Sequence, residues 1–505
     1  MTESAFVGRE GELAELSAAI AAARRGRGGI VFVAGEPGIG KTRLAEMATA
    51  SAAPSGLRVL WGRCWDGGLT PAFWPWLQVV QGCLAELEGD ISWPAPGDVP
   101  PLDALAPAWH HLLPTGAQPW PLSEALSAAP VSPGVAQLRL FDAISRLLRW
   151  TTERSPLVLV LDDLHWADAD SLALMRFLVS ASQQPGRPRD LPLAVIGTYR
   201  PEELHHNAVL ADLLADLAGS RDVAQIALGA LSTAEVGEFA TRLSGGPVAP
   251  AVLSAIAAQT EGNPFFVEEL VRQLLAAGWN LAEETAAAAC ERVPDGLRRV
   301  IARRLARLTP NALRLAQAAS VLGEGCSFDL IEATLAAAED RLAVQTPELD
   351  ALDEALAAGV LVEHGRGVRF RHPLIRRALY ESMSASRRER LHRRAAAAIE
   401  RLHARNLPPH FAALATHYRE GGSSDPETAI AYVLRAAEAA WDAYALSEAE
   451  AHWQTALALL EANGAEPLRR ADVLARLGDL AAATGSTTVR GVGYQERAIP
   501  LYEQA

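Results

Sequence analysis

The chain is organised around eight consecutive residues, Gly35-Glu36-Pro37-Gly38-Ile39-Gly40-Lys41-Thr42. An apolar run at residues 30–34 precedes them and a helical pattern follows from Arg43, so they occupy a strand–turn–helix unit. In this setting the pattern GxxxxGK[ST] predicts a phosphate-binding loop, the Walker A motif. Gly38 and Gly40 allow the backbone to approach phosphate oxygens closely. The N–H groups of the turn and of the helix N-terminus then face the anion.

This loop predicts ATP or ADP and Mg²⁺ as ligands. We expect Lys41 to reach the β- and γ-phosphates and the Thr42 hydroxyl to coordinate Mg²⁺. Just upstream, residues 6–10 have the sequence Phe-Val-Gly-Arg-Glu. We expect Val7 to pack on the adenine ring, and Arg9 either to pair with nearby carboxylates or to contact the nucleotide. An ordinary helix start also accounts for this segment.

A second motif lies downstream, where the apolar run at residues 157–161 ends in Asp162 and Asp163. A continuous apolar run is typical of a buried parallel strand, and the acidic residues at its end indicate a Walker B motif. Asp162 is predicted to hold Mg²⁺ through water, and Asp163 to orient or deprotonate the attacking water. The alternative is a solvated strand end. Asp170 or Ser171 is expected to cap the helix that follows.

Further strands complete the predicted sheet. The apolar run at residues 193–199 leads into Arg200, which we expect to sense the γ-phosphate; an ion-paired surface arginine is the alternative. Residues 57–61 and 223–228 are the other strand candidates. Strands that alternate with helices form a parallel sheet with helices on both faces. The first region is therefore predicted to be an α/β P-loop ATPase with its ligand at the carboxyl ends of the strands.

After Ser232 the strand pattern gives way to helices, and we expect Thr233 to cap the first of them. The turn Gly262-Asn263-Pro264 ends one helix and begins the next. Pro264 is predicted to touch the adenine ring from this helical lid.

A winged-helix-like region is predicted next, from three helical stretches and a short hairpin at residues 294–308, 328–335, 348–358 and 360–370. His372 is expected to begin another helix, which runs to Met383. The basic run from Arg387 to Arg394 is interpreted as a solvated helix face or a linker.

Helical hairpins fill the remainder of the sequence. Residues 432–443 are expected to pair with 447–461, and residues 469–482 with 491–504. Small residues alternate with bulky ones as in tetratricopeptide repeats, although the 34-residue period is not regular. The predicted regions are a P-loop AAA-like ATPase domain at 1–230, a helical lid at 231–293, a winged-helix-like domain at 294–394 and tetratricopeptide-like repeats at 395–505.

The overall composition narrows the protein class. No window of 18 unbroken apolar residues is present, which argues against a membrane span, and the N-terminus has no signal-peptide pattern. We therefore expect a cytoplasmic location. A net charge of −14 argues against general nucleic-acid binding. The four cysteines are far apart in sequence and are expected to be reduced packing residues: Cys64, Cys83, Cys290 and Cys326.

Together the motifs resemble those of the signal-transduction ATPases with numerous domains (STAND), and in particular the large ATP-binding LuxR-type and maltose-activator-like bacterial transcription regulators, whose module is an Orc1-like AAA ATPase. The resemblance covers nearly the whole chain. It rests on FVGRE at 6–10, GEPGIGKT at 35–42, GRCWDGG at 62–68, PAFWPW at 71–76, LVLDDLHWAD at 159–168, GTYRPEEL at 197–204, GNPFFVEEL at 262–270 and FRHPLIRRALYESM at 370–383.

The resemblance implies a closed resting form with ADP and an open, self-associating form with ATP. It also implies that His372 contacts the β-phosphate in the closed form. Such regulators end in a DNA-binding helix-turn-helix, and no such pattern follows the repeats here; cyclase domains precede the similar ATPase region of soluble adenylyl cyclases, and none precedes residue 6. We therefore expect contact with DNA only through a missing domain or a partner.

These observations predict a slowly hydrolysing ATPase that acts as a regulatory switch in bacterial signal transduction or transcription. A small-molecule or protein inducer is expected on the helical repeats. Two alternatives remain open, a regulator that acts directly on DNA and a scaffold that binds nucleotide without hydrolysing it.

Overall fold

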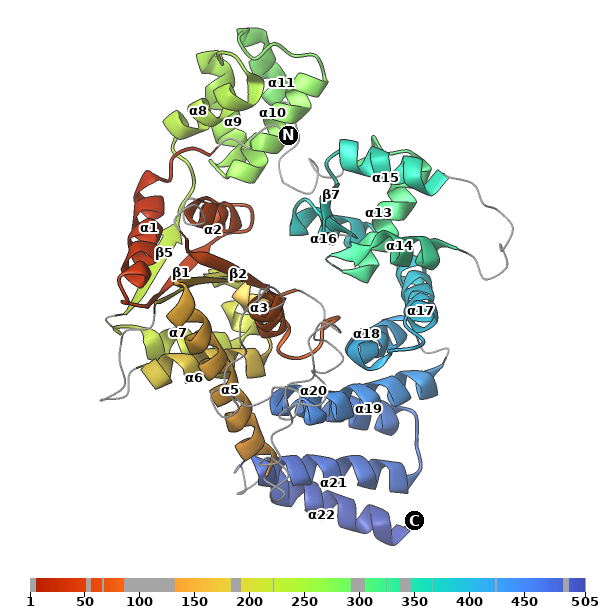
Figure 1. Ribbon diagram of the computed structural model, residues 1–505. Helices are drawn as coiled ribbons and strands as arrows, with labels where there is room; N and C mark the ends of the chain where they lie inside the picture. Colours follow the sequence, from red (N-terminus) through yellow and green to blue (C-terminus); the bar gives the residue numbers. More distant parts are fainter. Residues whose placement is uncertain are drawn as a thin grey trace.

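The computed structural model describes residues 6–50, 56–65, 68–85, 132–182, 192–220, 222–291, 305–323, 325–336, 347–365, 367–422, 425–484 and 490–504. Four regions follow one another along the chain (Figure 1). A sheet with flanking helices leads into a small helical lid. A mixed helix–hairpin region and a stack of helical hairpins come after it.

A five-stranded parallel sheet forms the core of the first region, in the order β2-β3-β4-β1-β5. The strands are β1 (Gly29–Gly35), β2 (Arg58–Arg63), β3 (Leu157–Asp162), β4 (Leu193–Tyr199) and β5 (Val223–Leu228). Every adjacent pair is parallel. The carboxyl ends of all five strands therefore lie along one edge.

Both faces of the sheet are covered by helices. Leu157, Leu159 and Leu161 of β3 pack on one face, and Val158 and Val160 pack on the other, because side chains alternate along a strand. The first face carries α3 (Trp74–Ala85), α5 (Pro133–Arg154), α6 (Ala169–Ser182) and α7 (Ala208–Leu217), and the second carries α1 (Glu10–Arg24) and α2 (Lys41–Ala50). The predicted α/β P-loop fold is confirmed.

The prediction of the N-cap residue of α6 is wrong. Asp168 caps this helix instead of Asp170 or Ser171: its Oδ1 accepts the backbone N–H of Ser171 at 2.7 Å, and its Oδ2 accepts the Ser171 hydroxyl at 2.6 Å. The Asp170 side chain is turned to a different helix, at residues 446–462, and accepts backbone N–H groups there.

The described helices of the lid lie above the sheet region in Figure 1. They are α8 (Thr233–Ser244), α9 (Pro250–Thr260), α10 (Pro264–Ala276) and α11 (Ala287–Glu291). Ser232, and not the expected Thr233, caps α8, because Ser232 and Glu235 form a reciprocal capping box. Val7 packs into the apolar core of this lid, among Val236 and Val267.

The third region has the predicted hairpin. Strands β7 (Leu361–His364) and β8 (Gly367–Phe370) are antiparallel, and β6 (Cys326–Ser327) pairs with β8 on its other side. Its helices are α13 (Pro310–Leu322), α14 (Phe328–Leu335), α15 (Pro347–Ala357) and α16 (Pro373–Ser382). Most of the helix predicted at residues 294–308 lies outside the described residues.

Helices continue to the last described residue. They are α17 (Ala385–Leu402), α18 (Phe411–Glu420), α19 (Pro426–Asp442), α20 (Leu446–Ala462), α21 (Pro467–Ala483) and α22 (Arg490–Gln504). The two predicted hairpins are present, since α19 packs on α20 and α21 packs on α22. The basic run at 387–394 is part of α17 and not a linker. Arg387, Arg390 and Arg393 are exposed and Leu391 and His392 are buried, so the run is the solvated helix face that was predicted as one of two alternatives. This helix also crosses the boundary that the sequence placed after residue 394.

All four cysteines are buried. Among the helices that the structure describes, none combines the length and apolar character needed to cross a membrane.

Candidate nucleotide-binding site

The phosphate loop, the Walker B acids and Arg200 meet because their strands are neighbours. The loop follows β1, Asp162 ends β3, and Arg200 follows β4, which lies between those two strands in the sheet. The parallel register brings these three strand ends to the same edge. The structure thus brings the Walker residues and Arg200 to one edge of the sheet.

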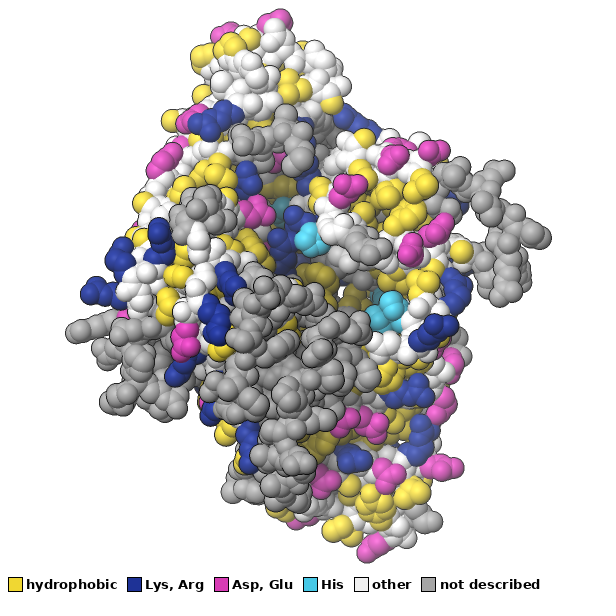
Figure 2. Space-filling view, in the orientation of Figure 1, with side chains coloured by type: hydrophobic (Ala, Val, Ile, Leu, Met, Phe, Trp, Pro, Cys, Tyr) yellow, Lys and Arg dark blue, Asp and Glu magenta, His cyan; other side chains and the backbone are white. Residues whose placement is uncertain are grey.

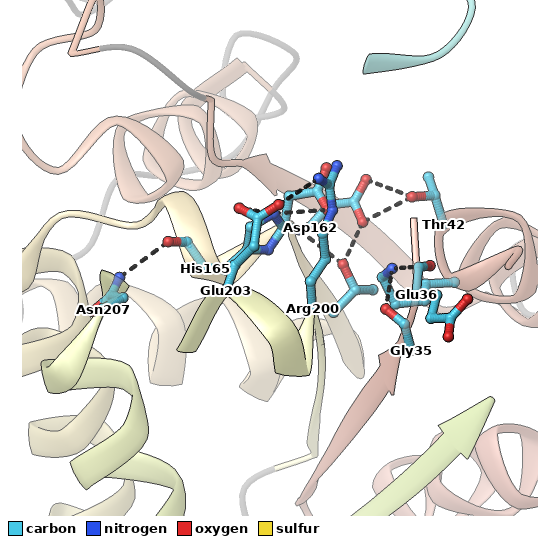
Figure 3. Close-up of polar contacts among 11 residues, drawn as sticks. Gly35, Glu36, Thr42, Asp162, His165, Arg200, Glu203 and Asn207 are labelled. Atoms are coloured by element: carbon cyan, nitrogen blue, oxygen red, sulfur yellow. Dashed lines mark hydrogen bonds and ion pairs between the residues drawn. The ribbon is translucent and has the colours of Figure 1, made fainter. Parts of the chain in front are cut away.

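Two threonine hydroxyl groups form hydrogen bonds with the carboxylate of Asp162 (Figure 3). Thr42 Oγ1 is 3.0 Å from Asp162 Oδ1 and 3.1 Å from Oδ2. Thr198 Oγ1 donates to Asp162 Oδ1 at 2.6 Å and accepts the backbone N–H of Asp163 at 2.8 Å. Carboxylate and hydroxyl oxygens are the ligands that Mg²⁺ prefers, so Thr42 and Asp162 fit the predicted metal role.

No cluster of three or more histidine, cysteine or acidic side chains suited to a metal occurs among the described residues. This is compatible with magnesium, which keeps several waters and substrate oxygens and takes only one or two carboxylates.

Lys41 is almost fully buried and is folded back on its own loop. Its Nζ donates to the carbonyl oxygens of Gly35 at 2.7 Å and of Glu36 at 2.9 Å. Burial lowers the pKa of Lys41 to about 8, although the nearby Asp163 carboxylate raises it. A phosphate anion would favour the charged form of this amine, because an opposite charge nearby stabilises an ammonium group.

The backbone of Asp163 is held in an uncommon conformation. Its φ and ψ angles are 58° and 47°, the left-handed region that a residue with a Cβ rarely adopts. The Thr198 hydroxyl accepts its N–H, which fixes this turn directly behind Asp162. Strained conformations of this kind persist where the surroundings enforce them, and they cluster at functional sites.

Arg200 is buried and ion-paired, so the alternative of an ion-paired surface arginine is right about the ion pair and wrong about the exposure. Its guanidinium donates to Glu203 Oε1 at 2.8 Å, and its Nε is buried without a hydrogen-bond partner. The contact comes from a short helix, η6 (Pro201–His206), that begins directly after Arg200.

The lid contacts the phosphate loop directly. Asn263 Nδ2 donates to the carbonyl oxygen of Pro37 at 3.0 Å, and the backbone N–H of Phe265 donates to that of Gly38 at 3.3 Å. A Cβ on Gly38 would lie 2.8 Å from Phe265 Cβ and 3.1 Å from Asn263 Oδ1, whereas one on Gly40 would meet nothing within 4 Å. Glycine at position 38 is thus required by the lid contact as well as by its positive φ of 81°.

His372 reaches the same place from the winged-helix-like region. Its ring stacks on Phe265 with centroids 4.0 Å apart, and its Nδ1 accepts the N–H of Leu374 at 3.2 Å. Burial, with the charges of Arg200 and Lys41, lowers the pKa of His372 to about 3. The ring is therefore neutral, and Nε2 carries the proton that it can donate.

One cavity of about 1470 Å³ joins these elements. It exceeds the ~300–1,000 Å³ of a typical small-molecule site, and Figure 2 shows it as a hollow with basic and histidine side chains at its edge. Of the predicted site residues, these line it: Val7, Arg9, Pro37, Gly38, Ile39, Gly40, Lys41, Thr42, Arg43, Asp162, Asp163, Arg200, Pro264 and His372.

Two predicted residues lie outside the cavity lining. Gly35 and Glu36 take part through their carbonyl oxygens, which accept from Lys41. Arg9 lines the cavity but pairs with Glu12 at 3.1 Å and also donates to Gly229 O. Arg9 was expected either to pair with nearby carboxylates or to contact the nucleotide, and the structure shows the carboxylate pair.

Sequence reasoning missed several residues of this site. Thr198 and Asn263 have a role only through partners 36 and 226 positions away, Asp162 and Pro37. The partner of Glu203, Arg200, is only three positions away. A polar residue inside an otherwise apolar strand was the one signal for Thr198.

Comparison with known proteins agrees with this geometry. Residues 5–196 match the family model of an AAA ATPase domain. A curated relative, an uncharacterized protein of Rhizobium meliloti (strain 1021), is 24% identical over 493 residues, which are 92% of this chain and 44% of the relative. The chain thus spans less than half the length of that relative.

Among solved structures, a signal-transduction ATPase with numerous domains and a tetratricopeptide repeat sensor, from Pyrococcus horikoshii, is similar over 100% of this chain and 65% of its own. The TM-score is 0.50 and the identity 15%, so the likeness concerns the fold. A Walker-type ATPase of Pyrococcus abyssi covers 74% of this chain and 96% of its own, with a TM-score of 0.34 and 15% identity. In this chain the region that matches the AAA ATPase family model is followed by a large helical region.

Proposed function

We propose that this chain is a nucleotide-controlled switch that binds ATP with Mg²⁺ and hydrolyses ATP slowly. The observation that carries the proposal is the meeting of three regions at the phosphate loop. The loop is contacted by Asn263 and Phe265 of the lid, and His372 of the winged-helix-like region stacks on Phe265. A nucleotide bound at the loop would therefore touch all three.

The chemistry assigned to each residue follows from its position. Lys41 exchanges its carbonyl partners for phosphate oxygens. Thr42 and Asp162 hold Mg²⁺, which offsets the negative charge of the β- and γ-phosphates. Asp163, at the tip of the strained turn, orients the attacking water or takes its proton. Arg200, on the adjacent strand end, turns toward the γ-phosphate.

The regulatory part of the proposal concerns the other regions. His372 donates from Nε2 to the β-phosphate when the winged-helix-like region is closed on the loop. An inducer on the helical repeats shifts the balance between closed and open forms by binding them with different affinity. We place this switch in bacterial signalling or transcription control, with self-association in the ATP form and contact with DNA through a further domain or partner.

Two variants test the nucleotide chemistry. We expect Lys41→Ala to weaken ATP binding at least about 100-fold, because a charge-assisted contact to the phosphates is lost. We expect Asp163→Asn to bind ATP like the wild type and to lose more than about 90% of turnover, because it removes the group that acts on water. Phosphate release and equilibrium binding of a fluorescent ATP analogue measure the two effects. Unchanged turnover in Asp163→Asn would contradict the role of Asp163.

A further inference from the structure

His165 is a buried histidine that the chemistry above does not use. Its side chain is fully buried, and neither ring nitrogen has a hydrogen-bond partner among the residues that the structure describes. It belongs to the short helix η5 (Leu164–Trp166), directly after Asp163. A buried polar group without a partner destabilises the fold, so one that is kept beside the candidate nucleotide site points to a function.

Two carboxylates lie at the same distance from this ring. His165 Nε2 is 3.8 Å from Asp163 Oδ1 and 3.8 Å from Glu203 Oε2. Burial, with the charges of Arg200 and Lys41, lowers the pKa of His165 to about 2. The ring is therefore neutral, neither contact is an ion pair, and 3.8 Å is too long for a hydrogen bond. A small movement of one N–H donor would join it to either acid.

Glu203 is shared between two neighbours. Its Oε1 accepts from Arg200 at 2.8 Å, while its Oε2 faces His165 (Figure 3). If Arg200 turned to a γ-phosphate, Glu203 would lose its ion-pair partner in a site where its side chain is only 17% exposed. A carboxylate in that position needs another donor, and the imidazole N–H of His165 is beside it.

The backbone around His165 is fixed, so the ring is the part that can move. Asn207 Nδ2 donates to the carbonyl oxygens of His165 at 3.2 Å and of Ala167 at 3.0 Å. The Thr198 hydroxyl fixes the N–H of Asp163 on the other side. Rotation of the imidazole alone is enough to change its distance from the two acids.

We propose that His165 is a positioning residue for the ATP form of the site. When Arg200 leaves Glu203 for the γ-phosphate, His165 Nε2–H donates to Glu203 Oε2 and replaces the guanidinium. His165 thus lets the site distinguish ATP from ADP, since ADP has no γ-phosphate to draw Arg200 away. This inference rests on the proposed function.

Substitution at both ends of the contact tests the proposal in the full-length chain. His165→Leu has a side chain of similar size but no hydrogen-bond donor. Glu203 then has no replacement for Arg200, and Arg200 stays with Glu203. We expect kcat/KM for ATP to fall about tenfold and the affinity for a fluorescent ATP analogue to fall with it, while the affinity for the ADP analogue changes less than about twofold. His165→Gln restores a donor and is expected to recover most of the loss.

Glu203→Gln in the His165→Leu background is the decisive variant. It removes the charge that holds Arg200, and we expect it to restore kcat/KM and the preference for ATP over ADP to within about threefold of the wild type. His403→Leu, at the C-terminal end of α17, is the control for an unrelated His→Leu change. A loss of affinity for both nucleotides, or a double variant no better than His165→Leu, would overturn the role of His165.

The two levels of the proposal fail in different ways. Turnover in the wild type no higher than in Lys41→Ala would refute ATP hydrolysis. The ratio of ATP to ADP affinity needs no turnover, so it still tests His165 in that case. A ratio that is the same in the wild type and in His165→Leu would refute the inference alone.

Discussion

Thr198 is a single hydroxyl on which both Walker B acids depend. It donates to Asp162 and accepts the N–H of Asp163, and its side chain is fully buried within β4. The two acids follow one another in sequence, but their relative orientation is set from the neighbouring strand. A side chain with no predicted chemistry therefore decides the geometry of two that were predicted.

We expect Thr198→Val to lower ATP turnover by about tenfold or more and the free energy of unfolding by about 1–3 kcal/mol, because the buried Asp162 loses a donor and the Asp163 N–H loses its acceptor. The shape of the side chain is kept, so packing changes little. A magnesium titration of turnover, with Thr198→Ser as the control that keeps the hydroxyl, measures the effect. Equal magnesium dependence in the valine and serine variants would show that the hydroxyl is not needed.

At the scale of elements, two glycines of the phosphate loop allow the contact between this loop and α10 to be tested. Gly38 and Gly40 both have positive φ, 81° and 104°, but only a Cβ on Gly38 would collide with the lid. Alanine at either position carries the backbone cost of the left-handed region, about 1–2 kcal/mol. The difference between the two variants isolates the lid contact.

We expect Gly38→Ala to lower the Tm further than Gly40→Ala and to increase amide hydrogen exchange at the start of α10. The backbone of Phe265 must move away from the loop to admit the new methyl group. Thermal unfolding and hydrogen exchange in the same buffer give the comparison. If Gly40→Ala were the more damaging of the two, the backbone conformation would outweigh the lid contact.

The elements themselves were well predicted, and for a physical reason. The strands β1 and β3 follow continuous apolar runs, β4 is apolar up to Thr198, and glycines mark the turn between β7 and β8, so the local pattern was enough. Contacts between distant segments had no such signal. Asn263 on Pro37 and Thr198 on Asp162 join residues 226 and 36 positions apart.

The cap errors show the same limit on a smaller scale. Asp168, Asp170 and Ser171 are all good capping residues, and the pattern alone did not select among them. The choice depends on α20, since Asp170 is taken up by that helix and Asp168 remains for α6. Likewise, the orphan nitrogens of His165 become visible only when the packing around the ring is known.

For the molecule as a whole, the AAA domain and the helical repeats share one apolar core. Leu147 of α5, Leu174 of α6, Trp453 of α20 and Leu477 of α21 belong to the same buried cluster. In Figure 1, α5 reaches from the sheet region to α21. The repeats are thus packed against the sheet region, in addition to being joined to it through the winged-helix-like region.

Asp170 is the polar centre of this junction. Its carboxylate accepts the N–H groups of Ser447 at 3.0 Å and Glu448 at 3.1 Å, at the start of α20, and the side chain of Gln137 at 3.0 Å. The residue is buried, and only seven positions separate it from Asp163. The segment that follows the Walker B acids is therefore hydrogen-bonded to the helical repeats through Asp170.

We expect this junction to weaken as pH rises. Burial, and next the charge of Asp168, raise the pKa of Asp170 to about 6; burial with the charges of Asp168 and Asp170 raises that of the half-buried Glu448 to about 7. The docked form therefore binds protons more tightly than an undocked form with ordinary carboxyl groups. Docking is most favourable near pH 4 and below, loses free energy between about pH 4 and 7, and is constant above about pH 8. The shift of the pKa of Asp170 from 3.8 to about 6 accounts for on the order of 3 kcal/mol.

Amide hydrogen-exchange protection factors of residues 446–462, measured from pH 5.5 to 8.5, test this expectation. Protection of the first turn of α20 should fall with rising pH in the wild type. Asp170→Asn keeps an acceptor oxygen but has no charge, so its profile should be flatter, while Asp170→Ala should lose protection at every pH because the N–H groups of α20 lose their cap. His452 Nε2 lies 3.9 Å from Glu448 Oε2, and an exposed histidine in the undocked form titrates in part of the same pH range. Glu448→Gln removes the carboxyl group of this pair and so separates the contribution of the Glu448–His452 contact from that of Asp170. A pH profile of Asp170→Asn as steep as that of the wild type would assign the dependence to Glu448 and His452 instead of Asp170.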